Sequence, residues 1–368
     1  MPRTDESALG AGDAQHVGVT RKSGRRPASG GASARLRGVK ILIAGGAGYI
    51  GSTVASYLED GGHVPVILDS LVTGREEFAR GRAFYRGDIR DDELVDRVFA
   101  EHPDITATVQ CAALIVVPES VADPLGYYDA NVAAGIAFLQ HLLRNGCNRL
   151  LFSSSAAIYA PADDFTVDED SPIEPPSPYA RTKAVFEQVL ADVATGTDLR
   201  VISLRYFNPI GADPQLRTGL QIAEPSHALG KMLQARRDGT PFEVTGTDWP
   251  TRDGTGIRDY VHVWDLARAH VAALARFDDV APSGATVINL GTGTGTTVLE
   301  LHDALRAVVG EDLPRVDGPP RPGDAAGCYP RSGRAKELLG WEPELGVEDG
   351  IRDTLRWFDV RGERLGLG

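Results

Sequence analysis

The sequence has few cysteines, no long apolar run and a deficit of positive charge. Cys111, Cys147 and Cys328 are widely spaced and include no Cys-x-x-Cys pair, which suits a reducing compartment and excludes a cysteine zinc site. No apolar run approaches the ~18 residues of a membrane span, and the N-terminus lacks a hydrophobic signal core. The net charge of -13 argues against nucleic acid or an anionic membrane as the main partner. We therefore expect a soluble cytoplasmic protein with no metal site.

The first 38 residues differ in composition from the rest of the chain. They consist mainly of Gly, Ala, Ser and Arg, with almost no large apolar side chain. Such a segment cannot bury enough surface to offset the entropy lost on ordering. We predict that residues 1–38 form a disordered tail; a functional basic arm and a transit peptide are the alternatives.

A glycine-rich turn follows the first apolar run. The run at 39–44 is typical of a central parallel strand, and Gly45, Gly48 and Gly51 come directly after it. In this spacing the glycines allow a tight turn, close approach of a pyrophosphate and packing of the following helix. The next predicted strand ends in Asp69, whose carboxylate can accept from both ribose hydroxyls and would repel a 2′-phosphate. The turn therefore predicts a site for NAD rather than NADP.

Strands and helices alternate along the first half of the chain. This alternation predicts an α/β fold, a Rossmann-like doubly wound parallel sheet over residues 39–208. Beyond Asn208 the rhythm weakens and glycines and prolines become more frequent. We expect residues 209–360 to form a smaller mixed α/β lobe.

Three residues of the first half suggest acid–base chemistry. Ser155 ends a predicted strand, at the edge where open α/β sheets bind ligands. Tyr179 and Lys183 lie four residues apart on a helix that Pro178 can open, so their side chains share one face. An ammonium beside a phenol favours the phenolate and lowers its pKa toward the working range. The alternatives are a surface Tyr and Lys on an ordinary helix, and a serine-rich turn.

With these motifs in place, the chain resembles the extended short-chain dehydrogenases and, most closely, the UDP-glucose 4-epimerase family. The resemblance runs from about Val39 to Phe358, and the run Asp253–Val263 is its most specific part. The other motifs are Gly45–Ser52, Gly87–Asp91, Pro118–Val121, Tyr127–Val132, Ser153–Tyr159, Tyr179–Lys183, Leu204–Pro209 and Arg321–Asp324.

The resemblance implies an isomerase that inverts carbon 4 of a UDP-hexose with bound NAD. Tyr179 would act as the base on the sugar 4-hydroxyl, Ser155 would hydrogen-bond the reacting oxygen, and Lys183 would tune Tyr179. The 4-keto sugar would turn about its diphosphate link before the hydride returns to its other face. The helices at 124–145 and 179–194 would join two copies in a homodimer.

The resemblance also assigns binding residues. Asn208 would hold the sugar or diphosphate, Arg258 and Arg321 would clamp phosphates, and Asp324 would reach the nucleoside ribose. In the family, a Tyr at the position of Cys328 is associated with plain hexoses. The smaller side chain of Cys328 would leave room for an N-acetyl group on the sugar. The cofactor-binding set is Gly45, Gly48, Tyr49, Ile50, Gly51, Asp69, Asp88, Ile89, Ala112, Ala113, Asn131, Ser153, Tyr179, Lys183, Tyr206 and Phe207.

The sequence departs from the family pattern at three places and leaves two other functions open. Ile115 stands where many family members carry a Lys that contacts the cofactor, and residues 224–229 lack the expected consecutive Asn and Leu. The aromatic residue expected against uracil is replaced near Val244 and Thr245. A nucleotide-sugar 4,6-dehydratase would need an acidic pair where Ala156 and Ala157 stand. A non-catalytic NAD-binding regulator is the alternative that is not an enzyme.

Overall fold

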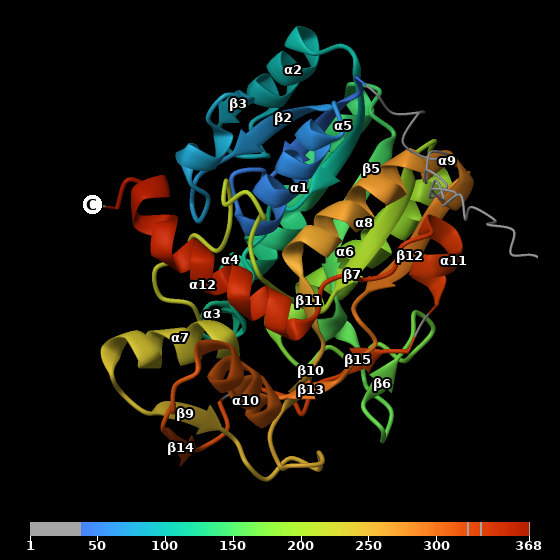
Figure 1. Cartoon of the computed structure of the whole chain (residues 1–368). Coiled ribbons are helices and arrows are strands. Elements are labelled where there is room, and N and C mark those ends of the chain that lie inside the picture. The colour runs from blue at the N-terminus through green and yellow to red at the C-terminus, as the bar shows by residue number, and fades with distance from the viewer. Residues whose placement is uncertain (1–37, 322–323, 332, 368) are drawn as a thin grey trace, which may run out of the picture. The chain divides into compact units, whose positions relative to one another are not determined.

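A computed structural model describes residues 38–321, 324–331 and 333–367 of the chain (Figure 1). The predicted tail at 1–38 lies outside the described residues, apart from Gly38. Within the described part, no helix is both long and apolar enough to cross a membrane.

The largest element is a parallel sheet of seven strands. Its spatial order is β3-β2-β1-β4-β5-β7-β12, so the chain winds outward in both directions from β1. The order reverses between β1 and β4, which is the switch point where such sheets bind ligands. The strands are β1 (Lys40–Ala44), β2 (Val64–Asp69), β3 (Ala83–Arg86), β4 (Ile105–Gln110), β5 (Arg149–Ser155), β7 (Arg200–Tyr206) and β12 (Gly284–Leu290).

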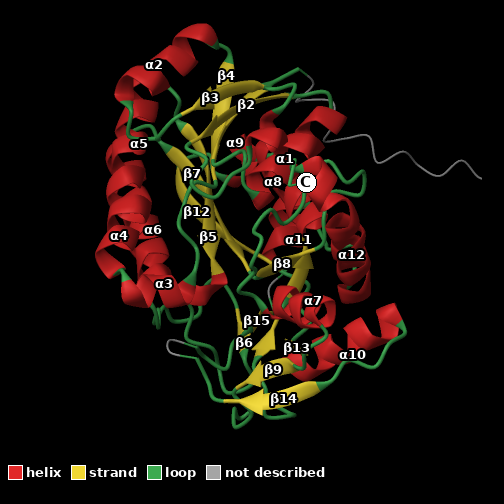
Figure 2. Cartoon of the chain, turned by 90° about the vertical axis from the view of Figure 1, so that its left-hand side faces the viewer, coloured by secondary structure: helices red, strands yellow, loops and turns green. Residues whose placement is uncertain are grey.

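Helices cover both faces of this sheet, which explains why its central strands are continuous apolar runs (Figure 2). Ile41 and Ile43 point to one face, where they share a core with the helices α1 (Tyr49–Asp60), α8 (Val263–Ala275) and α11 (Arg334–Leu339). Leu42 and Ala44 point to the other face. Their core includes α2 (Asp92–Glu101), α5 (Ala134–Arg144) and α6 (Pro178–Gly196). The predicted doubly wound sheet is confirmed.

The predicted helix at 124–145 is divided into three parts. It comprises α4 (Pro124–Tyr128), a π-helical turn (Asp129–Ala133) and α5. A π turn inserts one extra residue and is often retained at functional sites. Here it carries Asn131. The short helix α3 (Val117–Ala122) precedes α4, and both pack on α6.

The second half of the chain adds a smaller core of its own. It contains helices α7 (Ala228–Asp238), α10 (Val298–Val309) and α12 (Val347–Arg364), with the parallel pair β9 (Phe242–Thr245) and β14 (Arg315–Gly318). The short strand β8 (Asn208–Ile210) pairs with β11 (Tyr260–His262). The other short elements are η2 (Glu76–Ala79), η4 (Ala156–Ile158), β6 (Thr166–Val167), β10 (Ile257–Arg258), α9 (Phe277–Val280), β13 (Thr296–Thr297) and β15 (Tyr329–Pro330).

Strand β12 pairs with β7 along its whole length although it belongs to the range predicted for the second lobe. Helices α8 and α11 of that range also pack on the large sheet. The boundary between 39–208 and 209–360 therefore stays a proposal.

Candidate active site

The glycine turn lies between β1 and α1, at the carboxyl edge of the sheet. Gly45 has φ +78°, and a Cβ there would come within 2.5 Å of the Ala112 nitrogen. A Cβ on Gly51 would lie 2.3 Å from the Gly45 oxygen, so the helix packs directly on the turn. At Gly48, the N-cap of α1, a Cβ would meet only the Gly45 oxygen at 3.4 Å. This open position before a helix N-terminus fits a dinucleotide diphosphate.

Asp69, the last residue of β2, lies beside the same turn. Its carboxylate accepts hydrogen bonds from the Ala47 nitrogen (2.9 Å) and the Leu71 nitrogen (2.8 Å). Burial raises the pKa of Asp69, while these two backbone donors act in the opposite direction. The carboxylate therefore lies at the end of β2 next to the glycine turn, where a ribose contact was predicted.

Asp88 and Ile89 follow β3, and their surroundings differ from one another. Asp88 accepts from the backbone and the guanidinium of Arg90, whereas Ile89 is buried in the core below α2. Asp91, rather than Asp88, caps the next helix, because its side chain accepts from the Leu94 nitrogen at the start of α2.

Tyr179 and Lys183 lie one turn apart on α6, near Ser155 at the end of β5. Pro178 opens this helix, as the sequence indicated, and the Ser177 side chain caps it. Burial raises the pKa of Tyr179, and hydrogen bonding with Ser155 acts in the opposite direction. The Ser155 hydroxyl also accepts from the Ala157 nitrogen at 3.2 Å. Tyr179 and Ser155 thus form a pair at the sheet edge.

Lys183 is directed at the backbone of β5. Its Nζ donates to the Ser153 oxygen (2.8 Å) and lies 4.9 Å from the centre of the Phe152 ring. The residue is 4% exposed, and burial lowers its pKa to about 8, with the charges of Cys111 and Glu187 acting in the opposite direction. We expected Lys183 to lower the pKa of Tyr179; in the structure the burial of Tyr179 dominates and its pKa is raised.

A chain of buried polar groups leads from Ser153 away from the site. The Ser153 hydroxyl lies 3.1 Å from Cys111 Sγ and 2.9 Å from the Tyr206 hydroxyl. The Tyr206 hydroxyl contacts His270 Nε2, and His270 Nδ1 contacts the Leu266 oxygen at 2.7 Å. Because a carbonyl only accepts, Nδ1 carries the proton and Nε2 accepts from Tyr206. Burial lowers the pKa of His270 to about 4, which keeps the ring neutral at pH 7.

Asn131, in the π turn, joins the loop after β4 to α6. Its amide accepts from the Leu114 nitrogen (2.8 Å) and donates to the Leu114 oxygen (2.9 Å) and the Thr182 hydroxyl (3.0 Å). These bonds connect Asn131 to Leu114 and Thr182, the neighbours of Ala113 and Lys183.

Asn208 lies on β8, next to β11. Its nitrogen and its side-chain amide both donate to the Asp259 oxygen, at 2.9 and 3.2 Å. Phe207, directly before it, packs in a small cluster with Ala156 and Cys328. Phe207 and Asn208 therefore connect the end of β7 to the second half of the chain.

Arg258 is held by carbonyl oxygens. It donates to the oxygens of Ile257, Ala325 and Ala326 at 2.6–3.0 Å. A Cβ on Gly327 would lie 1.9 Å from the guanidinium, so only glycine fits there. Carbonyl oxygens orient the cation without neutralising it, and its charge stays available for an anion.

Arg321 and Asp324 contact each other. Nε of Arg321 donates to the Asp324 carboxylate (3.1 Å), and Nη1 donates to the Ser226 oxygen (3.1 Å). This arrangement keeps both residues beside segment 224–229, where the sequence departs from the family pattern. His227 in that segment caps α7 through its Nδ1.

Sequence reasoning missed Asp259 as an organising residue. Its fully buried carboxylate accepts from the nitrogens of Thr292, Gly293 and Thr294, and from the Thr292 hydroxyl. Burial raises its pKa to about 6 despite these donors. Its place inside the specific run Asp253–Val263 was the available signal, but the partner loop lies more than thirty residues away.

The fold and the glycine turn define a dinucleotide-binding protein with a doubly wound sheet. Residues 41–291 match the model of the NAD dependent epimerase/dehydratase family, so the chain belongs to that family.

Known relatives resemble the chain over nearly their whole length. The UDP-glucose 4-epimerase of Rhizobium meliloti (strain 1021) is 41% identical over 327 residues, which cover 88% of this chain and 98% of the relative. A crystal structure of UDP-glucose-4-epimerase from Stenotrophomonas maltophila, with bound NAD and formylated UDP-arabinopyranose, matches with a TM-score of 0.83 at 40% identity, covering 88% and 99% of the two chains. The UDP-Glc/GlcNAc 4-epimerase of Campylobacter jejuni matches with a TM-score of 0.73 at 34% identity, covering 88% and 99%.

Proposed function

We propose that this protein is an NAD-dependent isomerase that inverts carbon 4 of a UDP-hexose such as UDP-glucose or UDP-galactose. The observation that carries the proposal is the meeting of three features at the carboxyl edge of one sheet: the Gly45–Gly51 turn, the carboxylate of Asp69 and the pair Tyr179 and Ser155. The relatives named above, which are UDP-glucose 4-epimerases, support the same reaction.

NAD would lie along the carboxyl edge of β1, β2 and β4, and when bound it supplies the acceptor for the hydride of carbon 4. Gly48 and the N-terminus of α1 would receive its diphosphate, and Asp69 its adenosine ribose. Lys183, with its ammonium fixed by the Ser153 oxygen, would bind the nicotinamide ribose. Asn131 would hold the loop of Ala112 and Ala113 against α6.

The catalytic steps on the sugar fall to Tyr179 and Ser155. Tyr179 removes the proton of the 4-hydroxyl as carbon 4 is oxidised, and Ser155 donates a hydrogen bond to the developing carbonyl oxygen. After the 4-keto sugar has turned over, the hydride would return to the opposite face of carbon 4 and Tyr179 would return the proton to the carbon-4 oxygen. During this turn the diphosphate stays bound to Arg258, Arg321 and Asn208, so that only the sugar moves.

We propose that N-acetyl sugars are accepted as well. Cys328 packs against Ala156 and Phe207, directly beside the end of β5 that carries Ser155. A thiol occupies far less volume than a phenol ring, which leaves space for an acetamide on carbon 2. The Campylobacter jejuni relative, described as acting on UDP-Glc and GlcNAc, supports this.

We also propose a homodimer in a reducing compartment such as the cytoplasm. On the helices predicted to join two copies, Phe138, Leu139 and Phe186 are buried in the core against the sheet, whereas Val185 is 41% exposed. Val121 and Leu125, on α3 and α4, add exposed apolar surface next to α6. All three cysteines are free thiols, which suits a reducing environment.

The reaction is tested with a panel of nucleotide sugars incubated with the NAD-loaded protein and analysed for inversion at carbon 4. We expect UDP-galactose and UDP-glucose to interconvert. Bound NAD with no inversion and no reduced nicotinamide would favour the non-catalytic regulator. Loss of water from the sugar would indicate a 4,6-dehydratase, although Ala156 and Ala157 offer no acid or base for that step.

A further inference from the structure

The segment from Gly211 to Ile222, here called the linking segment, connects two parts of the proposed substrate site. It starts three residues after Asn208 and leads to Ser226, whose oxygen accepts from Arg321. It forms neither helix nor strand. Because it has no regular hydrogen-bond ladder, its position depends on contacts with other elements.

Helix α1, whose N-terminus is proposed to receive the NAD diphosphate, holds the linking segment along its whole length. The Tyr49 hydroxyl, at the first residue of α1, donates to the Gly211 oxygen at 2.6 Å. Asp60, the last residue, accepts from Arg217 at 2.7 and 2.9 Å. Between them, the hydroxyls of Thr53 and Thr218 lie 3.1 Å apart. A helix of this length spans ~18 Å, so the segment is fixed at two distant points.

Arg217 connects two carboxylates of different exposure. Asp213 is fully buried, contacts Nε of Arg217 and accepts from Nη2 at 3.2 Å and from the Gln215 nitrogen at 3.0 Å. Asp60 is partly exposed. Removing Arg217 would leave a buried charge without its partner and disturb the fold. Removing the charge of Asp60 breaks only the connection to α1.

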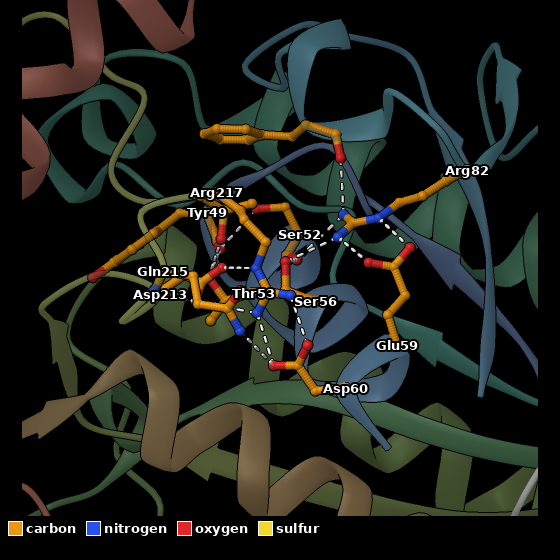
Figure 3. A network of polar contacts seen from close by, with 12 residues as sticks. Tyr49, Ser52, Thr53, Ser56, Glu59, Asp60, Arg82, Asp213, Gln215 and Arg217 are labelled. Carbon is orange, nitrogen blue, oxygen red and sulfur yellow. Dashed lines mark hydrogen bonds and ion pairs between the residues drawn. The ribbon is translucent and has the colours of Figure 1, made fainter. Parts of the chain in front are cut away.

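The neighbouring residue Glu59 offers a matched comparison. Glu59 pairs with Arg82, which also donates to the Ser56 hydroxyl and the Phe78 oxygen. Arg82 lies on a different side of α1 from Arg217 (Figure 3). Glu59 and Asp60 are adjacent, equally exposed and each bonded to one arginine. They differ in that only the partner of Asp60 belongs to the linking segment.

We propose that Tyr49, Asp60 and Arg217 are positioning residues that align the linking segment, and through it Asn208, with the cofactor helix. This inference rests on the proposed function. Helix α12 also contacts the segment, since the Trp357 indole donates to the Leu220 oxygen and the Gly211 nitrogen donates to the Thr354 hydroxyl. Those bonds fasten the segment to the second half of the chain, whereas the α1 bonds relate it to the cofactor site.

The test compares three variants of the full-length, NAD-loaded protein: Asp60→Asn, Glu59→Gln and Tyr49→Phe. UDP affinity is measured by calorimetry, KM and kcat with UDP-galactose, and folding by thermal melting. We expect Asp60→Asn to weaken UDP binding and raise KM by about threefold to tenfold, the effect of losing one charge-assisted hydrogen bond. Tyr49→Phe should show a similar loss and also lower kcat. Glu59→Gln should bind UDP like the parent protein even if its melting temperature falls.

Equal UDP affinity for Asp60→Asn and Glu59→Gln would overturn the inference while the proposed function stands. A parent protein that neither binds UDP nor inverts UDP-galactose would overturn both. Because Asp60 is partly exposed, its variant should fold, and the comparison does not depend on Tyr49→Phe being stable.

Discussion

At the scale of single residues, the site depends on how burial changes the chemistry of Tyr179 and Lys183. Burial disfavours the charged form of each, which raises the pKa of the phenol and lowers that of the ammonium to about 8. A phenol that acts as a base near neutral pH therefore needs an interaction that lowers its pKa. Hydrogen bonding with Ser155 lowers the pKa of Tyr179 in this way. The catalytic pair is consequently sensitive to the loss of a single hydroxyl.

Tyr179→Phe should cut turnover with UDP-galactose by ~10²-fold or more, because it removes the group that carries the proton. NAD content and melting temperature should stay close to those of the parent protein. Tyr127→Phe is the control: the Tyr127 hydroxyl bonds to the Val116 backbone, so its loss should cost stability but less than tenfold in turnover. A Tyr179→Phe protein with parental turnover would rule out Tyr179 as the base.

Cys328→Tyr should selectively lower activity toward N-acetyl sugars. Overpacking a rigid pocket costs ~1–3 kcal/mol, so turnover of UDP-N-acetylgalactosamine should fall by about tenfold or more. Turnover of UDP-galactose should change by less than about threefold. Cys328→Ser, which keeps the volume, should retain both activities. If the parent protein inverts UDP-galactose but not the N-acetyl sugar, Cys328 does not set the size of the pocket.

At the scale of elements, β5, β7 and α8 are tied together by buried polar groups behind the site. The chain from Ser153 through Tyr206 to His270 joins three elements by hydrogen bonds in an otherwise apolar core. A neutral His270 is required, because only the unprotonated Nε2 can accept from Tyr206. This requirement links the stability of the core to pH.

His270→Gln should be destabilised at pH 7, and its deficit relative to the parent protein should shrink at pH 5. His270 has a pKa of about 4 in the folded protein and ~6.5 when unfolded. Between these values the unfolded state binds a proton that the folded state does not, so the stability of the parent falls as pH falls. The deficit, measured by urea unfolding, should shrink by about 1–2 kcal/mol. A deficit that is constant with pH would mean that His270 takes up a proton as readily in the folded as in the unfolded protein.

At the scale of the whole molecule, the exposed apolar surface of α3, α4 and α6 is the part most suited to a second copy of the chain. Leu125 is 81% exposed and Val185 41%, and α3 and α4 both pack on α6. The apolar residues of α6 that face inward, such as Phe186 and Leu190, are already buried in the sheet core. The dimer surface proposed here is therefore separate from the surface that stabilises the monomer.

The double variant Leu125→Glu/Val185→Glu should be monomeric, because paired subunits would bury unpaired carboxylates. Light scattering at micromolar concentration should give twice the chain mass for the parent protein and once that mass for the variant. Val316→Glu, an equally drastic change at an exposed valine of β14, should remain dimeric. A parent protein of monomer mass would contradict the proposal.

The sequence by itself determined the features that depend on local chemistry. The alternation of strands and helices predicted the doubly wound sheet, and the spacing of Gly45, Gly48 and Gly51 predicted the turn, because φ > 0 and close packing allow little else. The helix opened by Pro178 placed Tyr179 and Lys183 one turn apart for the same local reason.

Only the tertiary structure decided how distant segments meet. The hydrogen bond from Lys183 to the Ser153 oxygen, the buried carboxylate of Asp259 and the position of β12 beside β7 each join residues 30 or more positions apart. The connection of Asp60 to Arg217 spans 157 positions. Such contacts depend on the packing of complementary side chains from distant parts of the chain, and no local propensity or spacing encodes which partner each side chain finds.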